Sequence, residues 1–399
     1  DSGDQVLVLG AGLAGLSASV ELRRAGVPHQ VLERDAQPGG LCRTSEEVGY
    51  RFDRTGHLLH LRDEGLRREV TEWLGAGALL DVERRSAVFS QGVYTRYPFQ
   101  ANVHGLPPEL AYACVRDFVQ AHFAAPGAPA TTFEDYCLQT FGRAICDAFM
   151  IPYNQKLWGV HPRELDRSWC DRFVPRPSLD DVLRGAFGVD PPQLGYNARF
   201  VYPRLGAGAL VGALVDRAGH VRLSTPALRV RLAARKLLVA GAELPFSRLL
   251  SSLPPDVLLS CIAGPPHAVA RAAGRLRSVP LSYLDLALNT PVEQPHHWVY
   301  VPEERFSFYR VGSYSNLSAA MCPPNKGSLY VELATREPLE LATILPRVAA
   351  ELTEMGMIRA PEAIRFARLR RIEHAYVIFD RAREEALRVI EPFLAERGI

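Results

Sequence analysis

Short apolar runs near the start of the chain alternate with a helical pattern. Residues 6 to 9 are consecutive apolar residues, and a second short run ends at Glu33. Between them, residues 13 to 24 place apolar side chains at the three- and four-residue spacing of an amphipathic helix. This order predicts a strand, a helix and a second strand within about 30 residues, which is a βαβ unit.

The pattern changes twice further along the chain. From 96 to 198 it becomes helical and rich in aromatic residues, and from 199 to 260 short strand-like runs return. A second strand-rich block covers 280 to 332, and helices are expected at 338 to 354 and 384 to 397. The sequence therefore predicts an α/β protein in which helical and β-sheet substrate domains are inserted into a Rossmann-like, dinucleotide-binding domain.

These changes give the expected domain boundaries. The Rossmann-like domain is discontinuous, because the helical insertion separates its first part from its second part. The predicted segments are 1–95 and 199–278 for the Rossmann-like domain, 96–198 for the helical substrate-binding insertion, 279–376 for the β-sheet substrate domain and 377–399 for a return helix.

Three glycines follow the first predicted strand in the order G-x-G-x-x-G. Gly10 makes the tight turn, Gly12 lets the backbone approach a pyrophosphate, and Gly15 lets the helix pack closely on the strand. The helix N-terminus then offers N–H donors and a partial positive charge to the phosphates. Glu33 is placed to accept hydrogen bonds from ribose hydroxyls. These residues predict dinucleotide binding and leave NAD and FAD open.

A second glycine-rich segment favours FAD. Gly39 and Gly40 come shortly after the second strand, Arg43 follows them, and a further turn reads Thr-Gly-His at 55 to 57. This order and spacing resemble the loop by which glutathione-reductase-like and amine-oxidase-like flavoproteins lay their backbone along FAD. The alternative is that the paired glycines form an ordinary surface turn.

Composition and charge narrow the function classes. The 399 residues carry 46 Lys and Arg against 44 Asp and Glu, so no global field favours nucleic acid or an acidic membrane. No apolar run is long enough to span a bilayer, and no charged-then-apolar leader opens the chain. The seven cysteines are scattered without metal-binding spacing, which favours a reducing cytoplasm and predicts no metal site.

Residues 153 to 172 combine large aromatic side chains with cations. This segment, YNQKLWGVHPRELDRSWCDR, lacks the Leu, Ile or Val repeat of a core-facing helix. The mixture favours a surface for a flat, polar and negatively charged ligand. The alternative is a helix whose tryptophans anchor a core while its arginines face water.

Several motifs in sequential order resemble those of the UDP-galactopyranose mutase family, most of all its eukaryotic-type members. The motifs are YPFQANV at 97–103, YNQKLWGV at 153–160, WVYVPEERFSFYR at 298–310 and RRIEHAY at 370–376. The resemblance implies a flavoenzyme in which reduced FAD acts as a nucleophile and the overall reaction is redox-neutral. Flavin N5 would form an adduct with the sugar of UDP-galactose or a related nucleotide sugar, so that pyranose and furanose forms interconvert.

The resemblance also implies roles for individual residues. Arg172 and Arg310 match the arginines that stabilise the diphosphate, and His57 matches the histidine beside flavin N5. The implied substrate-binding residues are Gln100 at the nucleoside end, Asn154 and Trp158 in the cleft, and Tyr300 and Tyr376 as partners of the arginines. The implied cofactor-binding residues are Gly10, Gly12, Gly15, Glu33, Gly39, Gly40, Arg43, Gly56 and Ala227.

The chain departs from the family pattern at three places. The asparagine that the eukaryotic-type members carry beyond their catalytic arginine has no clear match in DDVLRGAFG at 180–188, so recognition of the sugar hydroxyls is expected to differ. The turn that usually reads Gly-Gly-His is Thr55-Gly56-His57. The Gly-Arg strand that touches the flavin in the family would begin where this chain ends, at LAERGI, so a flavin-contacting C-terminal segment is expected to be absent.

Two other functions stay open. An amine-oxidase-like or desaturase-like flavoenzyme would remove hydride from an amine or apolar substrate, and a binding module would hold a nucleotide sugar without turnover. There is no second dinucleotide fingerprint, so NAD(P)H as an external reductant would have to bind transiently in the same cleft. Trp169 is expected in the core, and the residues expected to be solvated charges are Lys156, Lys236, Arg368, Arg370 and Arg371.

Overall fold

The predicted βαβ unit is present at the centre of a parallel sheet. The computed structural model describes residues 5–125, 127–189, 194–195, 198–334 and 337–399. The unit consists of β1 (Val6–Leu9), α1 (Leu13–Arg24) and β2 (His29–Leu32). The sheet has the order β13-β1-β2-β9, with every pairing parallel.

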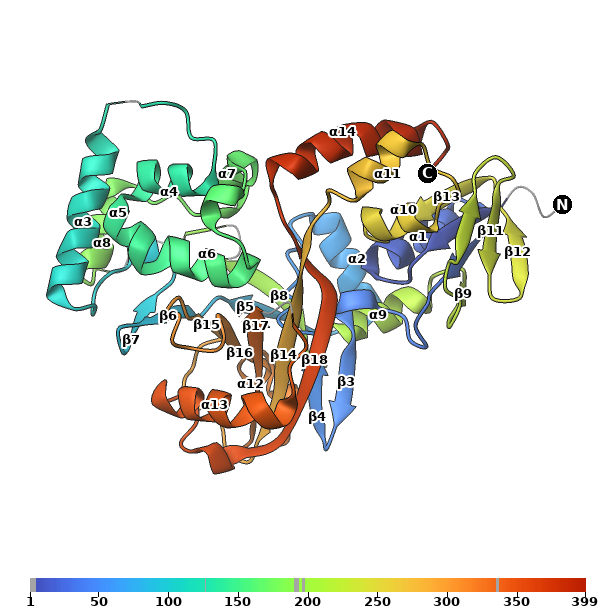
Figure 1. Cartoon of the computed structure of the whole chain (residues 1–399). Coiled ribbons are helices and arrows are strands. Elements are labelled where there is room, and N and C mark those ends of the chain that lie inside the picture. Colours follow the sequence, from blue (N-terminus) through green and yellow to red (C-terminus); the bar gives the residue numbers. More distant parts are fainter. Residues whose placement is uncertain (1–4, 126, 190–193, 196–197, 335–336) are drawn as a thin grey trace.

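The outer strands of this sheet return from late in the chain. They are β9 (His220–Arg222) and β13 (Arg248–Ser251), which flank the first unit on either side. The neighbouring helices are α9 (Gly208–Val215), α10 (Pro255–Cys261), α11 (His267–Ala273) and α14 (Arg381–Ala395). Ile390 of α14 shares an apolar cluster with Leu7 of β1 and Leu249 of β13, and α14 lies beside α11 (Figure 1). The Rossmann-like domain is therefore discontinuous, as predicted.

A seven-stranded sheet forms the second large unit, with the order β18-β14-β17-β16-β15-β6-β7. Its strands are β6 (Ser86–Ser90), β7 (Val93–Arg96), β14 (Ser278–Leu288), β15 (Trp298–Tyr300), β16 (Arg310–Ser313), β17 (Gly327–Ala334) and β18 (Ile364–Val377). α13 (Leu341–Glu354) covers one face, where Val348 and Leu352 pack with Val311 and Val331. The opposite face packs against the helical insertion.

The first two strands of this sheet come from the segment that the sequence assigned to the Rossmann-like domain. β6 pairs in parallel with β15, with Ser86 opposite Trp298 and Val88 opposite Tyr300. All five residues of β6 are buried, so the strand needs a partner on an inner sheet position. In the structure the sheet therefore begins about ten residues before the predicted boundary at 95.

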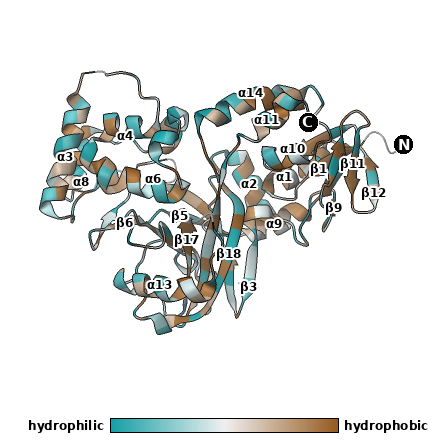
Figure 2. Ribbon diagram, in the orientation of Figure 1, coloured by the Kyte–Doolittle hydropathy of each residue, from teal (hydrophilic) through white to brown (hydrophobic). Residues whose placement is uncertain are grey.

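The helical insertion lies to one side of the sheet (Figure 1). Its helices are α3 (Pro108–Phe123), α4 (Phe133–Phe141), α5 (Arg143–Ile145), α6 (Ile151–Trp158), α7 (Cys170–Phe173) and α8 (Leu179–Ala186). Thr132 and Ser178 form capping boxes that start α4 and α8. Helices α3 and α14 each carry hydrophobic and hydrophilic segments (Figure 2), as expected for helices with one buried face.

Smaller elements connect these units. They are α2 (Glu64–Leu74), α12 (Tyr314–Leu317), the hairpin of β3 (Thr44–Glu47) and β4 (Tyr50–Asp53), the pair β5 (Leu79–Glu83) and β8 (Arg199–Pro203), and the small sheet of β10 (Arg229–Arg231), β11 (Lys236–Val239) and β12 (Ala242–Pro245). Within the described ranges, no helix has both the length and the apolar character needed to cross a bilayer.

Candidate active site

The glycine turn after β1 has the geometry of a phosphate-binding turn. Gly10 has φ +95°, a left-handed value that favours glycine, and its N–H donates to Leu32 O at 2.8 Å. A Cβ added at Gly15 would lie 1.9 Å from the Gly10 carbonyl oxygen, so only glycine permits this approach. Gly12 stands at the N-cap of α1 and offers no side chain. The first N–H groups of α1 are therefore open to an anion.

The second glycine pair lies against this turn. The Gly39 N–H donates to Ala11 O at 2.7 Å, and a Cβ on Gly40 would come 3.2 Å from the Gly12 Cα. Two backbone segments without side chains thus face each other at the N-terminus of α1. A diphosphate requires backbone donors and an unobstructed approach, so these residues fit the central part of a dinucleotide.

Glu33 and Arg43 stand beside the two glycine turns. The buried Glu33 carboxylate accepts from the Ala11 N–H at 2.8 Å and the Asp35 N–H at 2.9 Å. Arg43 pairs with Asp35 at 2.9 Å and lies 4.0 Å from Glu33. Each Glu33 oxygen has a further lone pair, so the carboxylate can accept from ribose hydroxyls as well.

Ala227 lies near Glu33 through a neighbouring backbone contact. The Thr225 N–H donates to the Glu33 carbonyl at 2.7 Å, and Ala227 follows two residues later. Its carbonyl oxygen lies 3.4 Å from the Cys261 thiol, and its side chain packs against an apolar cluster. The cofactor role of Ala227 stays a prediction.

The turn that carries His57 begins at a fixed carboxylate. Asp53 is 1% exposed and accepts from Thr44 Oγ1 at 2.5 Å, Tyr202 Oη at 2.7 Å and the Ala207 N–H at 3.1 Å. The Tyr314 hydroxyl donates to the Asp53 carbonyl at 2.7 Å. Burial raises the pKa of Asp53 to about 6, although the hydrogen bonds from Thr44 and Tyr202 lower it in part. The start of the turn is therefore held by four residues from three segments of the chain.

The rest of the turn is closely packed and locally strained. Thr55 has φ +64°, which is unfavourable for a β-branched residue, and a Cβ on Gly56 would meet Tyr330 Oη at 2.3 Å. The His57 Nδ1 is buried and has no hydrogen-bond partner among the described residues. Burial lowers the pKa of His57, and Glu332 opposes this shift only in part. The imidazole is therefore neutral at pH 7, with a free polar atom at its ring.

Arg310 and Tyr376 meet, as the sequence motifs implied. Arg310 Nε donates to Glu332 Oε2 at 2.6 Å, and Nη2 donates to Glu332 Oε1 at 2.8 Å and to Tyr376 Oη at 3.1 Å. Glu332 is completely buried, and its electrostatic attraction helps to raise the pKa of Arg310 against the effect of burial. Sequence reasoning missed Glu332, although an acid two residues after Tyr330 in an apolar strand marks a polar partner on the same face.

Aromatic side chains surround this ion pair. Tyr300 lies opposite Arg310 in the β15–β16 pairing and packs against Tyr97 at 4.9 Å and Tyr153 at 5.3 Å between ring centroids. Trp158 packs edge-on against Tyr376 at 5.8 Å. Burial raises the pKa of Tyr376, while Arg310 lowers it. Tyrosine hydroxyls and a guanidinium thus gather on one face of the seven-stranded sheet.

Two predicted substrate residues have partners inside the protein. Asn154 donates to Met150 O at 2.8 Å and accepts from Trp158 Nε1 at 3.1 Å, so both ends of its amide are used within α6. Gln100 donates to Pro175 O at 2.7 Å, but its buried Oε1 has no partner among the described residues. Gln100 therefore keeps an acceptor for a ligand donor, whereas Asn154 mainly orients the Trp158 ring.

Arg172 is not brought together with Arg310. It lies exposed on the short helix α7, with its guanidinium 5.2 Å from the centre of the Phe173 ring. Arg310 is held in the sheet by Glu332. The two arginines that the motifs assign to one diphosphate therefore occupy separate domains in this structure.

Lys156 was expected to be solvated, and this prediction is wrong. Its ammonium donates to the backbone carbonyls of Val301 at 3.1 Å, Glu303 at 2.9 Å and Phe308 at 2.6 Å. Burial is the main effect on its pKa, which is lowered to about 8. The lysine fastens α6 to the loop between β15 and β16, and it thereby sets the distance between Trp158 and the sheet.

Arg368 and Arg370 are not solvated charges either. Both pair with the fully buried Asp285, at 2.9 Å and 3.2 Å, and Arg368 also pairs with Glu47 at 2.6 Å. Lys236 and Arg371 do lie in partly exposed surface pairs, with Glu243 and Glu373. Trp169 packs against Phe133 at 4.9 Å and Trp158 at 5.7 Å at the edge of the core.

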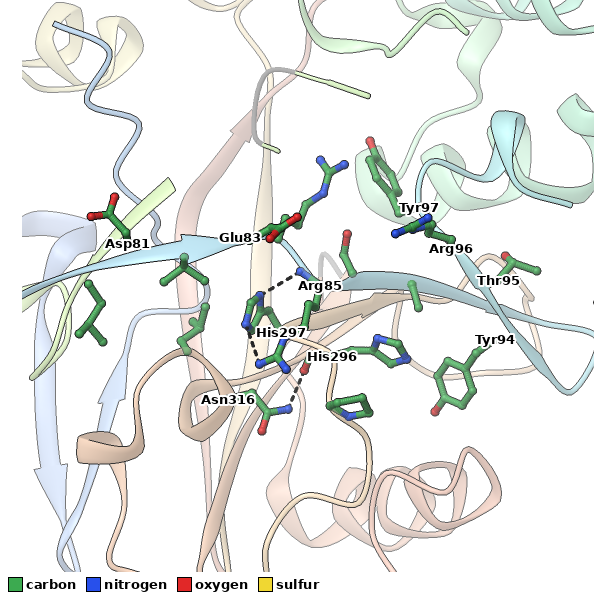
Figure 3. A pocket seen from close by; sticks show the side chains of 17 residues that line it. Asp81, Glu83, Arg85, Tyr94, Thr95, Arg96, Tyr97, His296, His297 and Asn316 are labelled. Carbon is green, nitrogen blue, oxygen red and sulfur yellow. Dashed lines mark hydrogen bonds between the residues drawn. The ribbon is translucent and has the colours of Figure 1, made fainter. Parts of the chain in front are cut away.

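A cavity of about 900 Å³ opens next to the aromatic group (Figure 3). It is lined by residues 80–87, 94–97, 295–297, 316 and 317. Tyr97 borders it and packs on Tyr300, and Arg84 stands 4.8 Å above the Tyr97 ring. On its floor, burial lowers the pKa of His297 to about 4, and the Arg85 N–H donates to Nδ1 of this neutral ring at 3.1 Å. Cationic and aromatic side chains therefore line this cavity as well as the site around Arg310.

Comparison with known proteins gives a family and several similar mutases. A model of the flavin containing amine oxidoreductase family matches residues 13–335. The probable UDP-galactopyranose mutase of Klebsiella pneumoniae is 25% identical over 198 residues, which cover 48% of this chain and 50% of that protein. The dTDP-fucopyranose mutase of Escherichia coli is 22% identical over 185 residues, which cover 45% of this chain and 48% of that protein. The chain thus spans about half the length of the curated mutases that it matches.

The structural similarity extends further than these alignments. A crystal structure of reduced UDP-galactopyranose mutase superposes with a TM-score of 0.92 and 26% identity. The superposition covers 99% of this chain and 89% of that chain. The arrangement of the Rossmann-like domain and both inserted domains is therefore shared with this mutase.

Proposed function

Since the chain belongs to the family of flavin-containing amine oxidoreductases, we propose that it is an FAD-dependent nucleotide-sugar mutase. The reaction would be a redox-neutral interconversion of pyranose and furanose forms of UDP-galactose or a related nucleotide sugar. The observation that carries this proposal is the ion pair of Arg310 with buried Glu332, joined to Tyr376 and surrounded by tyrosines. The similarity to two mutases by sequence and to one by structure supports it.

The polarity of this region separates the proposal from amine or apolar-substrate oxidation. An enzyme that removes hydride from an apolar or amine substrate needs an apolar or aromatic cage around the reacting carbon. Here a guanidinium and several phenols converge, which suits the oxygens of a diphosphate. We therefore favour mutase chemistry over the oxidase chemistry of other members of the family.

Each residue at the site would have a separate task. Bound, reduced FAD supplies a nucleophile for the anomeric carbon of the sugar. Arg310 stabilises the charge of the departing nucleoside diphosphate, and Tyr376 and Tyr300 orient its oxygens. Neutral His57 offers its free nitrogen to the flavin edge or to a sugar hydroxyl, and Gln100 Oε1 accepts from the nucleobase.

Arg172 would complete the diphosphate site from the helical insertion. It is exposed and pairs with no described carboxylate. A second guanidinium on the diphosphate would be gained when α7 approaches the sheet around bound substrate. We propose NAD(P)H as an external reductant, which would bind transiently in the same cleft, and a cytoplasmic location, which the free thiols suit.

The substrate class is tested by turnover of a panel of nucleotide sugars. The FAD-loaded, dithionite-reduced protein is incubated with UDP-galactose, UDP-glucose and dTDP-linked hexoses, and the furanose and pyranose forms are separated by ion-pair chromatography. Interconversion of at least one nucleotide sugar is expected. Oxygen consumption with amines, together with no interconversion of any nucleotide sugar, would replace the proposal with an oxidase.

A further inference from the structure

Arg54 is a half-buried cation without a partner. It lies between Asp53 and Thr55, at the start of the His57 turn. Its guanidinium makes no hydrogen bond or ion pair with any residue that the structure describes. Removing a charge from water is unfavourable unless an opposite charge or acceptors replace the water. The position of Arg54 therefore indicates that its guanidinium pairs with a negatively charged group that is not part of the chain.

The charges around Arg54 strengthen this requirement. Burial has the largest effect on the pKa of Arg54 and lowers it. The next largest effects come from Arg43, which lowers it, Tyr283, which raises it, and Arg370, which lowers it. Asp35 raises it least among these groups, and Asp35 is already paired with Arg43 at 2.9 Å. Two like charges thus act on Arg54, and the carboxylate of Asp35 already serves Arg43.

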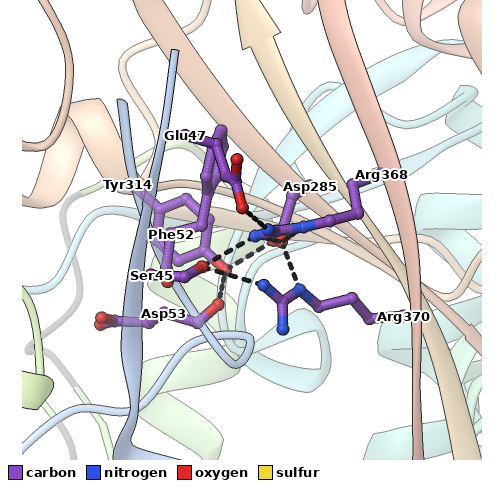
Figure 4. Close-up of polar contacts among 8 residues, drawn as sticks. All are labelled: Ser45, Glu47, Phe52, Asp53, Asp285, Tyr314, Arg368 and Arg370. Atoms are coloured by element: carbon purple, nitrogen blue, oxygen red, sulfur yellow. Dashed lines mark hydrogen bonds and ion pairs between the residues drawn. The ribbon is translucent and has the colours of Figure 1, made fainter. Parts of the chain in front are cut away.

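Arg370 also has an unused donor. Asp285 forms ion pairs with both Arg368 and Arg370 but accepts hydrogen bonds only from Arg368, and Ser45 Oγ accepts from Arg368 at 2.8 Å and from Arg370 at 3.0 Å (Figure 4). The Arg370 Nε lies 3.2 Å from Asp285 but is buried and makes no hydrogen bond with correct geometry. Asp285 and Glu47 together balance the two guanidinium groups, and the Arg370 Nε stays without a hydrogen-bond acceptor among the described residues.

These cations lie between the two features that fit FAD. Arg43 is fixed to the Gly39–Gly40 loop by its bond to Pro38 O at 2.9 Å, and that loop touches Gly12 at the N-terminus of α1. Arg54 stands three residues before His57 in the turn expected at the flavin ring. The β3–β4 hairpin pairs Thr44 with Asp53, so Arg54 comes next to Arg43 at the end of the hairpin that leads into the Gly39–Gly40 loop.

We propose that Arg54, with Arg370 behind it, binds the diphosphate of FAD. This inference rests on the proposed function, because it takes FAD as the cofactor. The diphosphate is the part of FAD that is negatively charged in both the oxidised and the reduced cofactor. The diphosphate would form an ion pair with Arg54 and accept hydrogen bonds from the open N–H groups of α1.

The first test is the affinity of the apoprotein for FAD. Flavin fluorescence titration should show that Arg54→Met binds FAD about 10- to 100-fold more weakly than wild type, equally for oxidised and reduced FAD. The matched control is Arg51→Met, which removes an arginine of the preceding strand β4 that pairs with Glu46 at 2.9 Å and should leave the affinity unchanged. Wild-type affinity in Arg54→Met, or weakening confined to reduced FAD, would overturn the assignment. If wild type itself does not bind FAD, the proposed function fails and not only this contact.

The second test separates ligand binding from a structural role. Without FAD, Arg54 is repelled by Arg43 and Arg370, so Arg54→Met should leave the melting temperature of the apoprotein unchanged or higher. With saturating FAD, the same variant should have a lower melting temperature than wild type, because weaker cofactor binding stabilises the folded protein less. A melting temperature lowered equally with and without FAD would show that Arg54 only supports the fold.

Discussion

Arg310 and Glu332 form a two-point ion pair, with Nε to Oε2 at 2.6 Å and Nη2 to Oε1 at 2.8 Å, and the carboxylate has no exposed surface. The two residues face each other across the β16–β17 pairing. The pair fixes the plane of the guanidinium, so the remaining N–H donors point to Tyr376 and to any ligand on that face. The account of catalysis depends on this fixed direction.

Removal of the guanidinium should abolish turnover without loss of flavin. Arg310→Ala is expected to keep the flavin absorbance of wild type, because Arg310 lies away from the glycine turns. It should also lower the free energy of unfolding by about 3 to 5 kcal/mol, since Glu332 is left buried and unpaired. Chromatographic turnover and urea unfolding check both effects.

The double variant Arg310→Met/Glu332→Gln distinguishes catalysis from stability. It removes both charges, so most of the lost stability should return while turnover stays absent. Turnover restored together with stability would exclude Arg310 from the diphosphate site.

The fit of Gly56 against Tyr330 can be tested by one methyl group. Gly56→Ala should cost about 2 kcal/mol and displace the His57 turn, because the new Cβ would meet Tyr330 Oη at 2.3 Å. Adding Tyr330→Phe removes that oxygen and should recover part of the loss. Gly212→Ala on α9 is the matched control, since a Cβ there meets nothing within 4 Å. Equal stability of the Gly56 and Gly212 variants would contradict the packing described for the turn.

Lys156 and Lys236 should behave differently although the sequence suggested the same environment for both. Lys156→Met leaves three carbonyls without their donor and should lower the unfolding free energy by about 3 kcal/mol. Lys236→Met removes a partly exposed ion pair with Glu243 and should change the unfolding free energy by less than about 0.5 kcal/mol. Denaturant unfolding measures both, and a near-neutral Lys156→Met would show that the clamp on α6 is dispensable.

Asp53 should make the wild type less stable as pH rises from about 4 to 6. Burial raises its pKa from 3.8 to about 6, so the folded protein holds a proton in this window that the unfolded chain has released. The difference corresponds to about 3 kcal/mol. Asp53→Asn lacks this titration, so its stability relative to wild type should increase across the window. Urea unfolding of both proteins at several pH values checks the slope, and parallel curves would mean that Asp53 titrates normally.

The parts of the site that sequence predicted are those formed by local patterns. Gly10, Gly12 and Gly15 act within one turn, whereas the contact of Tyr376 with Arg310, 66 residues apart, followed only from the family resemblance. Lys156 and Arg368 were misjudged because their partners lie far away in the chain, and Glu332 was missed although its partner Arg310 lies 22 residues away on the neighbouring strand. Whether a lysine meets water or three carbonyls depends on how α6 packs against residues 301–308, which no local spacing encodes.

The domain boundary at 95 shows the same limit. β6 lies in the segment assigned to the Rossmann-like domain, but its partner β15 begins about 200 residues later. The pattern of a strand predicts that it is buried, but it does not predict which sheet the strand joins. The predicted α/β class was therefore correct, while the point at which the chain passes between sheets required the structure.

The most direct test of the central claim is turnover of FAD-loaded protein with UDP-galactose under anaerobic conditions, with the flavin either oxidised or reduced by dithionite. The account predicts interconversion of the pyranose and furanose forms only by the reduced protein, with no net oxidation of the flavin after many turnovers. Equal activity of both forms, or stoichiometric reoxidation of the flavin by substrate, would contradict a redox-neutral mutase in which reduced flavin is the nucleophile.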